Sequence, residues 1–312
     1  MEIANSLDAD PKRAHQLRQI LEAHAAWLEE QPGGVRAALS GANLNDVKLE
    51  RPNLRKAILT SATLLEADLS GADLSGASLD GADFRQASLP GADLSEADLT
   101  NADFVRCWLA EVNLSEAILH GTNFQRSHLR AARMHEARIH QCNFLGAILQ
   151  SAGLHHASAF DSNFSDANLE DALLYHVRFQ SCRFRAANAS RANFTSANLL
   201  ACDFHGAQLT GAKFYGADLR GSCFARATMK ECDLREAKLR AVDFNFAVLT
   251  NARFEDAQMF TADLRGANLQ GARGLTAAQL SQARTDERTI LPSGRPGPYV
   301  KGSGAERPRS RI

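Results

Sequence analysis

A period of five residues constrains this chain more than any other feature of its sequence. Every fifth residue from Leu39 to Leu269 is almost always large and apolar: of these 47 positions, 28 are Leu and 13 are Phe. Two residues earlier in each repeat the side chain is small, and it is Ala at 33 positions. A period of five fits neither an α-helix, with 3.6 residues per turn, nor a strand that alternates every two residues.

The period can be met by short extended segments joined by corners. Side chains alternate between the two sides of an extended chain, so the small and the large residue of one repeat share a side. The next inward residue follows three positions later, which requires the chain to turn once per repeat. The pattern therefore predicts an all-β solenoid whose interior holds one small and one large apolar residue per repeat.

Phenylalanines indicate how many repeats complete one coil. Nine of them recur every 20 residues, and we expect them to form a structural column: Phe84, Phe104, Phe124, Phe144, Phe164, Phe184, Phe204, Phe224 and Phe244. Aromatic rings can stack at the strand spacing of about 4.8 Å between neighbouring coils. One coil is therefore four repeats, the cross-section is four-sided, and the repeats form about 12 coils.

The repeats resemble a known family. The stretch ADLSGADLSGASLDGADF, which ends at Phe84, is similar to the consensus A(D/N)LXX of the pentapeptide-repeat family. The resemblance extends over about three quarters of the chain. It implies a right-handed quadrilateral parallel β-helix, and the handedness comes from the resemblance alone.

The ends of a solenoid expose their cores, so caps are expected at both termini. We predict an N-terminal segment over residues 1–34 with a capping helix at about 11–30, because Pro11 suits the first helical position. The β-helix is predicted over residues 35–273, and a short helical C-terminal cap over residues 274–292. Residues 293–312 are rich in Gly, Pro and Arg, which predicts a flexible basic tail.

The sequence has no arrangement of residues typical of an enzyme or a cofactor site. HExxH, GxSxG and GxGxxG are absent, and the six Cys form no CxxC pair, which favours a reducing compartment. Three pairs of His are one coil apart: His120 and His140, His135 and His155, and His156 and His176. No carboxylate or thiolate pattern completes a metal site around them. We therefore expect no catalysis, no cofactor and no metal.

Charge limits the class of partner. Lys and Arg total 35 against 36 Asp and Glu, so a nucleic-acid partner is not expected. The local balance differs: residues 66–103 carry nine acids against Arg85 alone, whereas residues 124–191 are rich in Arg. No apolar run approaches the length of a membrane span, and no signal peptide is evident. We expect a bacterial cytoplasmic protein, with secretion by a route that needs no signal peptide as the alternative.

Outward apolar residues identify a candidate partner-binding edge. Repeat arithmetic places Val105 and Leu145 outward after the Phe face, and Trp108 and Ile148 outward on the next face. Arg126 and His128 lie on the coil between them. Contiguous exposed apolar surface usually marks a contact, and Trp and Arg are favoured at interfaces. A protein partner, or a second copy of the chain in a homodimer, would bind here.

The sequence thus predicts a non-enzymatic rod that acts as a scaffold or effector in protein–protein interaction. The family resemblance implies an alternative, because some pentapeptide-repeat proteins mimic DNA, bind DNA gyrase and protect it from quinolones. Those rods are acidic over most of their length, whereas this chain is acidic over only about two coils.

Overall fold

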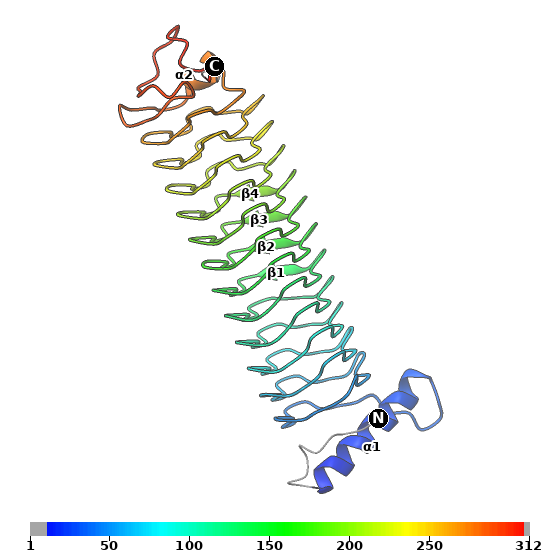
Figure 1. Ribbon diagram of the computed structural model, residues 1–312. Helices are drawn as coiled ribbons and strands as arrows, with labels where there is room; N and C mark the ends of the chain where they lie inside the picture. The colour runs from blue at the N-terminus through cyan, green and yellow to red at the C-terminus, as the bar shows by residue number, and fades with distance from the viewer. Residues whose placement is uncertain (1–10, 309–312) are drawn as a thin grey trace. The chain divides into compact units, whose positions relative to one another are not determined.

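The computed structural model describes residues 11–308 and divides the chain into two compact units, Met1–Gly153 and Leu154–Ile312. Each unit is a stack of similar coils (Figure 1). Helix α1 (Pro11–Leu28) and strand β1 (Arg138–His140) belong to the N-terminal unit. The C-terminal unit contains β2 (Ser158–Phe160), β3 (Arg178–Gln180), β4 (Asn198–Leu200) and α2 (Ala277–Gln282).

Coils are joined by parallel pairing between residues 20 apart. In the N-terminal unit, Asn43 pairs with Thr63, Lys48 with Asp68, Asn53 with Asp73 and Ile58 with Ser78, which gives four pairings per coil. In the C-terminal unit, β2, β3 and β4 pair in parallel, with Phe179 of β3 opposite Ala159 and Leu199. Each coil is therefore 20 residues long and four-sided, as the sequence predicts.

The interior holds the large residue of every repeat and the small residue of every repeat except Ala42 in the first coil, which is half-buried. Representative pairs such as Ala72 and Leu74, or Ala212 and Phe214, are buried. Rings of the Phe column stack from Phe84 to Phe144 in one unit, with centroids 4.7–5.1 Å apart. In the other unit they stack from Phe164 to Phe244, with centroids 4.5–5.6 Å apart.

Corners depend on two local features that the consensus encodes. The Asp or Asn between the two inward residues accepts a hydrogen bond from the backbone N–H two positions later, as in Asp73 to Ser75, at 3.0 Å. This side-chain turn holds the first corner residue in place. The second corner residue adopts positive φ, for example 61° at Gly76 and 56° at Glu66. Positive φ explains the frequent Gly at this position.

The first coil is capped by α1 through a residue that sequence analysis did not select. His24 is fully buried, and its Nδ1 accepts a hydrogen bond from the Ala37 N–H at 3.1 Å. Its Nε2 lies 3.1 Å from the carbonyl oxygen of Arg55, so the ring is the neutral tautomer with a proton on Nε2. Leu17 and Leu21 are buried on the same stripe of the helix.

The last coil is covered by α2 and the segment after it. Thr276 and Gln279 form a capping box at the start of α2. The Gln279 Nε2 donates to the carbonyl oxygens of Phe254 and Ala257, which ties α2 to a preceding coil.

Residues 293–308 differ from the flexible tail that their composition predicts. The Ser293 N–H donates to the Ala305 carbonyl oxygen at 3.1 Å, and both residues are buried. This closure buries small apolar surface and satisfies backbone groups, which offsets the conformational freedom of the Gly-rich segment. Residues 1–10 of the predicted N-terminal segment and residues 309–312 of the predicted tail lie outside the described residues. Over the described part of the chain, neither helix has the length and apolarity needed to cross a bilayer.

Candidate interaction edge

An exposed Trp lies at the centre of the candidate edge, within the N-terminal unit. Trp108 is 50% exposed, although it occupies the middle of a paired backbone segment. Its indole stacks on the imidazole of His128 one coil later, with ring centroids 4.7 Å apart and planes 26° apart. We call the set Val105, Trp108, Arg126, His128, Leu145 and Ile148 the Trp108 edge.

A backbone ladder fixes the spacing of the aromatic pair. Trp108 pairs in parallel with His128, and His128 pairs with Ile148. The His128 N–H donates to the Cys107 carbonyl oxygen at 2.9 Å, and the Ile148 N–H donates to the Ser127 carbonyl oxygen at 2.9 Å. The three side chains are thus held one coil apart on a rigid face.

The adjoining corner supplies the remaining residues of the edge. The backbone N–H groups of Val105 and Leu145 are held by the side chains of Asp103 and Asn143, at 3.0 and 3.1 Å. Both apolar side chains are half-buried. Arg126 is exposed, and no carboxylate among the described residues lies within ion-pair distance of its guanidinium. The edge therefore combines an exposed aromatic, half-buried aliphatic side chains and an unneutralised cation.

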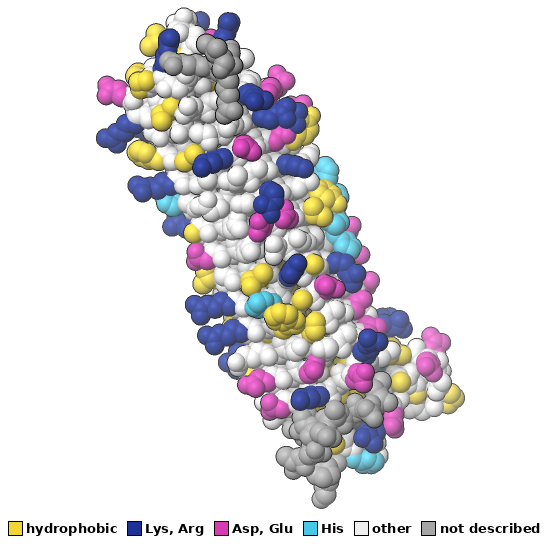
Figure 2. Space-filling view, viewed as in Figure 1, with side chains coloured by type: hydrophobic (Ala, Val, Ile, Leu, Met, Phe, Trp, Pro, Cys, Tyr) yellow, Lys and Arg dark blue, Asp and Glu magenta, His cyan; other side chains and the backbone are white. Residues whose placement is uncertain are grey.

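Hydrophobic side chains and a His adjoin one another on the face shown in Figure 2, where much of the surrounding surface is charged or polar. In the N-terminal unit, Asp83 and Asp103 lie on the face that precedes Val105. Asp83 is engaged by Arg85, with Nη2 2.6 Å from Oδ2. The hydrogen bond from the Arg85 guanidinium holds the pKa of the Asp83 carboxyl below its ordinary value.

This Asp–Arg arrangement recurs, and sequence analysis did not identify it. Arg follows a central Asp by two positions in four repeats, and in each the guanidinium contacts both carboxylate oxygens: Asp83 and Arg85, Asp218 and Arg220, Asp233 and Arg235, and Asp263 and Arg265. The sequence pattern that could have identified these ion pairs is the tripeptide Asp-Leu-Arg or Asp-Phe-Arg. These acids are neutralised locally, so a count of charges overstates their effect on a partner.

Histidines from the sequence analysis occur in two settings. In the C-terminal unit, His156 and His176 stack with ring centroids 5.3 Å apart, and His155 stacks on Tyr175 at 4.9 Å. In the N-terminal unit, the Nδ1 of His135 is 2.8 Å from the Ser115 hydroxyl. Across residues 11–308, no three His, Cys, Asp or Glu side chains come together in a way that could hold a metal ion.

The cysteines lie at the small interior position, apart from Cys223. The Sγ of Cys107 donates to the Phe84 carbonyl oxygen at 2.7 Å, and burial raises the pKa of this thiol to about 12. Burial also raises the pKa of the Cys232 thiol. A thiol with a raised pKa is a poor nucleophile at neutral pH, so these residues serve packing.

Comparisons with known proteins agree with the coil geometry. A family described as pentapeptide repeats, in eight copies, matches residues 37–76, 77–115, 107–146, 202–240 and 227–266. A second family, described as a pentapeptide repeat region, matches residues 132–209. Among curated proteins, none matches the chain.

Solved structures of similar proteins include HetL from the cyanobacterium Nostoc sp. strain PCC 7120, a pentapeptide repeat protein involved in heterocyst differentiation regulation. It is 26% identical, the match covers 75% of this chain and 91% of HetL, and the TM-score is 0.30. QnrB1, a plasmid-mediated fluoroquinolone resistance protein, is 19% identical over 72% of this chain and 89% of its own, with a TM-score of 0.29. A pentapeptide repeat protein of the Arabidopsis thaliana thylakoid lumen is 31% identical over 32% of this chain and 68% of its own, with a TM-score of 0.23.

Proposed function

Because the chain belongs to the pentapeptide-repeat family, we propose that it is a non-enzymatic scaffold that binds a protein partner through the Trp108 edge. Inward positions of the repeat are used for packing, and outward positions are free to vary. A repeat protein of this kind presents continuous faces rather than an enclosed catalytic pocket.

The exposed Trp108 is the observation that carries the proposal. Its ring makes no contribution to the core, and half of its surface remains accessible. Stacking on His128 orders the indole before any partner arrives, which lowers the entropic cost of binding. Trp and Arg are the residue types most enriched at interface hot spots, and Arg126 lies on the intervening coil with its guanidinium unpaired by any described carboxylate.

A protein suits this surface better than a nucleic acid. The formal net charge of the chain is -1, and the carboxylate of Asp103, which has no described Lys or Arg within ion-pair distance, adjoins the edge. A phosphate backbone would be repelled there, since nucleic-acid affinity depends on neutralising phosphates with Lys and Arg. The apolar side chains Val105, Leu145 and Ile148 match an apolar patch rimmed by polar groups on a partner.

The test identifies the partner first and measures its affinity second. A photo-crosslinking amino acid at Gln125, between Val105 and Leu145 on the corner, captures the partner in cells for identification by mass spectrometry. The same amino acid at Gln208, an exposed position on the corresponding face of the C-terminal unit, is the control. The partner is then purified and titrated against the wild-type chain.

We expect Trp108→Ala to weaken binding of the purified partner by about 2 kcal/mol or more, or roughly 30-fold in Kd. Phe260→Ala, which removes an aromatic ring that is 54% exposed in the C-terminal unit, should leave the affinity unchanged. Sedimentation of the chain alone measures its oligomeric state, which shows whether the bound partner is a different protein or a second copy of the chain. Equal affinities for wild type and Trp108→Ala would refute the role of this edge.

A further inference from the structure

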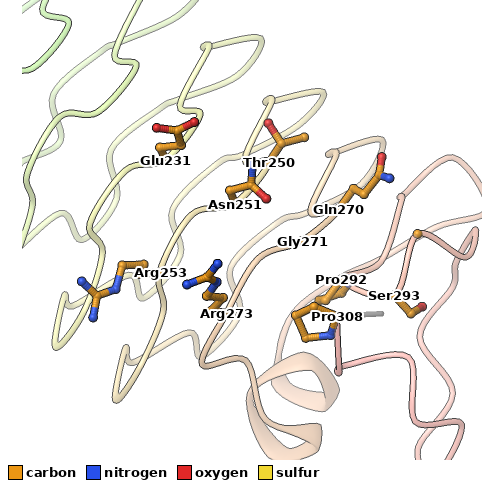
Figure 3. Close-up of a pocket in the computed structure, with 11 residues that line it drawn as sticks. Glu231, Thr250, Asn251, Arg253, Gln270, Gly271, Arg273, Pro292, Ser293 and Pro308 are labelled. Carbon is orange, nitrogen blue, oxygen red and sulfur yellow. The ribbon is translucent and has the colours of Figure 1, made fainter. Parts of the chain in front are cut away.

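A cleft of about 1290 Å³ lies in the C-terminal unit, on the side of the last coils, and is separate from the Trp108 edge. Its walls come from three successive coils, which carry Glu231, Asn251 and Gly271, and from the segment that folds back after α2 (Figure 3). Arg253 and Arg273 line one side, Asn251 and Gln270 line another, and Pro292 and Ser293 close it.

The two arginines are an unusual pair for this fold. Arg253 and Arg273 are direct partners across a parallel bridge, so their side chains start about 4.8 Å apart. Like charges placed opposite each other on adjacent strands are destabilising. Arg253 also pairs with Asp233 on its other side, whereas the only cross-coil partner of Arg273 among the described residues is Arg253.

Among the described residues, Arg273 has no carboxylate within ion-pair distance, and Arg253 has only a long ion pair with Glu255. The Nε of Arg253 comes no nearer than 3.9 Å to the Glu255 carboxylate. No acid within residues 11–308 lies within ion-pair distance of Arg273. The nearby Asp233 is already held by Arg235, whose Nε and Nη2 contact its two oxygens at 2.7 and 2.6 Å. An anion from outside the chain would therefore relieve the repulsion between Arg253 and Arg273.

The rest of the lining favours a peptide as the source of that anion. The side-chain amides of Asn251 and Gln270 offer donors and acceptors that match peptide N–H and C=O groups. Glu231, at another part of the wall, disfavours a polyanion such as a nucleic acid while accepting a peptide N–H or a basic side chain. The volume also exceeds what a single small anion needs.

We propose that this cleft binds a carboxylate-bearing peptide segment, with Arg253 and Arg273 gripping one carboxylate between them and Asn251 and Gln270 pairing with the peptide backbone. Gly271 favours this arrangement because it has no side chain. A Cβ at Gly271 would lie 2.3 Å from the Asn251 Oδ1, so the missing side chain leaves room for that amide. This binding site does not depend on a partner at the Trp108 edge.

The experiment uses the full chain and fluorescence anisotropy of labelled peptides. The probe is a decapeptide of Ser and Gly with one central Glu, and the matched peptide replaces that Glu with Gln. We expect the Glu peptide to bind at least about tenfold more tightly, and its affinity to fall as salt is raised. Similar affinity for the two peptides would overturn the proposal.

Three variants assign the binding to the cleft. Arg273→Gln and Arg253→Gln should each weaken the Glu peptide about tenfold, because each removes a charge-assisted hydrogen bond. Arg178→Gln is the matched control, since Arg178 is also an exposed central residue of this unit but lies on another face. It should change the affinity less than twofold. Circular dichroism establishes that all three variants fold, which is expected for exposed side chains.

Two further probes distinguish the chemistry of the ligand. Inorganic phosphate should compete with the Glu peptide only weakly, because it cannot use Asn251 and Gln270 as a peptide does. A single-stranded oligodeoxynucleotide should not compete. If the oligodeoxynucleotide bound more tightly than the Glu peptide, and Arg273→Gln abolished that binding, the ligand would be a nucleic acid. This outcome would overturn the proposal. Unchanged Glu-peptide binding in both cleft variants would overturn it as well.

Discussion

The two units share one backbone pattern but fill their interiors differently. In the N-terminal unit, Leu74, Leu94 and Leu114 occupy the face opposite the Phe column. In the C-terminal unit the corresponding face carries Phe194 and Phe214, which stack on each other at 4.9 Å. The ladder of residues 20 apart is the same in both units, so the backbone rather than the size of the side chain sets the coil spacing.

The second column creates contacts that the N-terminal unit lacks among its described residues. Phe204 stacks on Phe184 and Phe224 within its own column, at 4.5 and 4.7 Å. It also meets Phe194 and Phe214 edge to face, at 6.0 and 6.4 Å. Edge-to-face pairs add to area burial because the positive edge of one ring meets the negative face of another. The C-terminal unit therefore gains orientation-dependent stabilisation that Leu cannot supply.

The largest expected effect tests this comparison directly. Phe204→Ala and Phe104→Ala each delete a buried ring between two stacked neighbours, and each should cost about 3–5 kcal/mol. We expect Phe204→Ala to cost about 1 kcal/mol more, because it also loses two edge-to-face contacts. Native-state hydrogen exchange measures the free energy of opening in each unit separately, which avoids the assumption of a single two-state transition.

Leu99→Ala and Leu219→Ala provide the baseline, since both remove a buried Leu from the same face of the coil in the two units. The loss of unfolding free energy should agree within about 1 kcal/mol for these two substitutions. A difference of that size is expected because the surroundings of each cavity relax to a different extent. Equal costs for Phe204→Ala and Phe104→Ala would show that the second Phe column adds packing volume and nothing more.

The caps of the two units are expected to respond to acid in different pH ranges. Burial lowers the pKa of His24 below its ordinary value of 6.5, and the nearby Arg36 guanidinium acts in the same direction. As pH falls below 6.5 the unfolded chain takes up a proton that the folded ring resists, so the folded state loses stability. Protonation would also leave the buried Ala37 N–H without its acceptor, a loss of about 1–3 kcal/mol.

The C-terminal cap should be insensitive over that range. The backbone N–H of Gly266 holds the pKa of Asp286 below its ordinary value of 3.8. A carboxylate with a lowered pKa stabilises the folded state at pH values above 3.8. That contribution is lost as the pH falls below this value. Between about pH 6.5 and pH 5, only the N-terminal cap should therefore loosen.

Trp27 reports the N-terminal change, because its indole stacks on His24 with centroids 5.5 Å apart. In a Trp108→Phe background, the Trp27 emission should change between pH 7 and about pH 5. His24→Gln should abolish the pH dependence. Constant Trp27 emission over this pH range in the Trp108→Phe variant that retains His24 would contradict the proposed titration.

The smallest expected effect concerns the charge difference between the units. Apart from Arg85 and Asp83, the ion pairs among the described residues lie in the C-terminal unit. The acids of residues 66–103 are followed within the N-terminal unit by Arg126, Arg130, Arg133 and Arg138. We expect no inhibition of DNA gyrase supercoiling and no protection from quinolone at sub-micromolar protein, because a change of sign repels a basic DNA-binding surface. Inhibition at sub-micromolar protein would favour the DNA-mimic alternative.

The sequence alone determined the class of fold. A register that never slips from Leu39 to Leu269 requires one turn per repeat, and the 20-residue spacing of Phe requires four repeats per coil. The comparisons support the right-handed quadrilateral β-helix that the family resemblance implied. This much is local, since the choice of inward or outward for each side chain follows from alternation along an extended segment.

Only the tertiary structure decided how outward groups are paired. The sequence did not single out His24, and only docking onto the first coil gives its two nitrogens partners at Ala37 and Arg55. The sequence did not single out Arg253 and Arg273, and only the returning segment at Pro292 and Ser293 makes them part of a cleft. Hydrogen bonding and charge pairing depend on distances between residues far apart in the sequence, and a repeat period fixes those distances within the coils but not in the segments that close them.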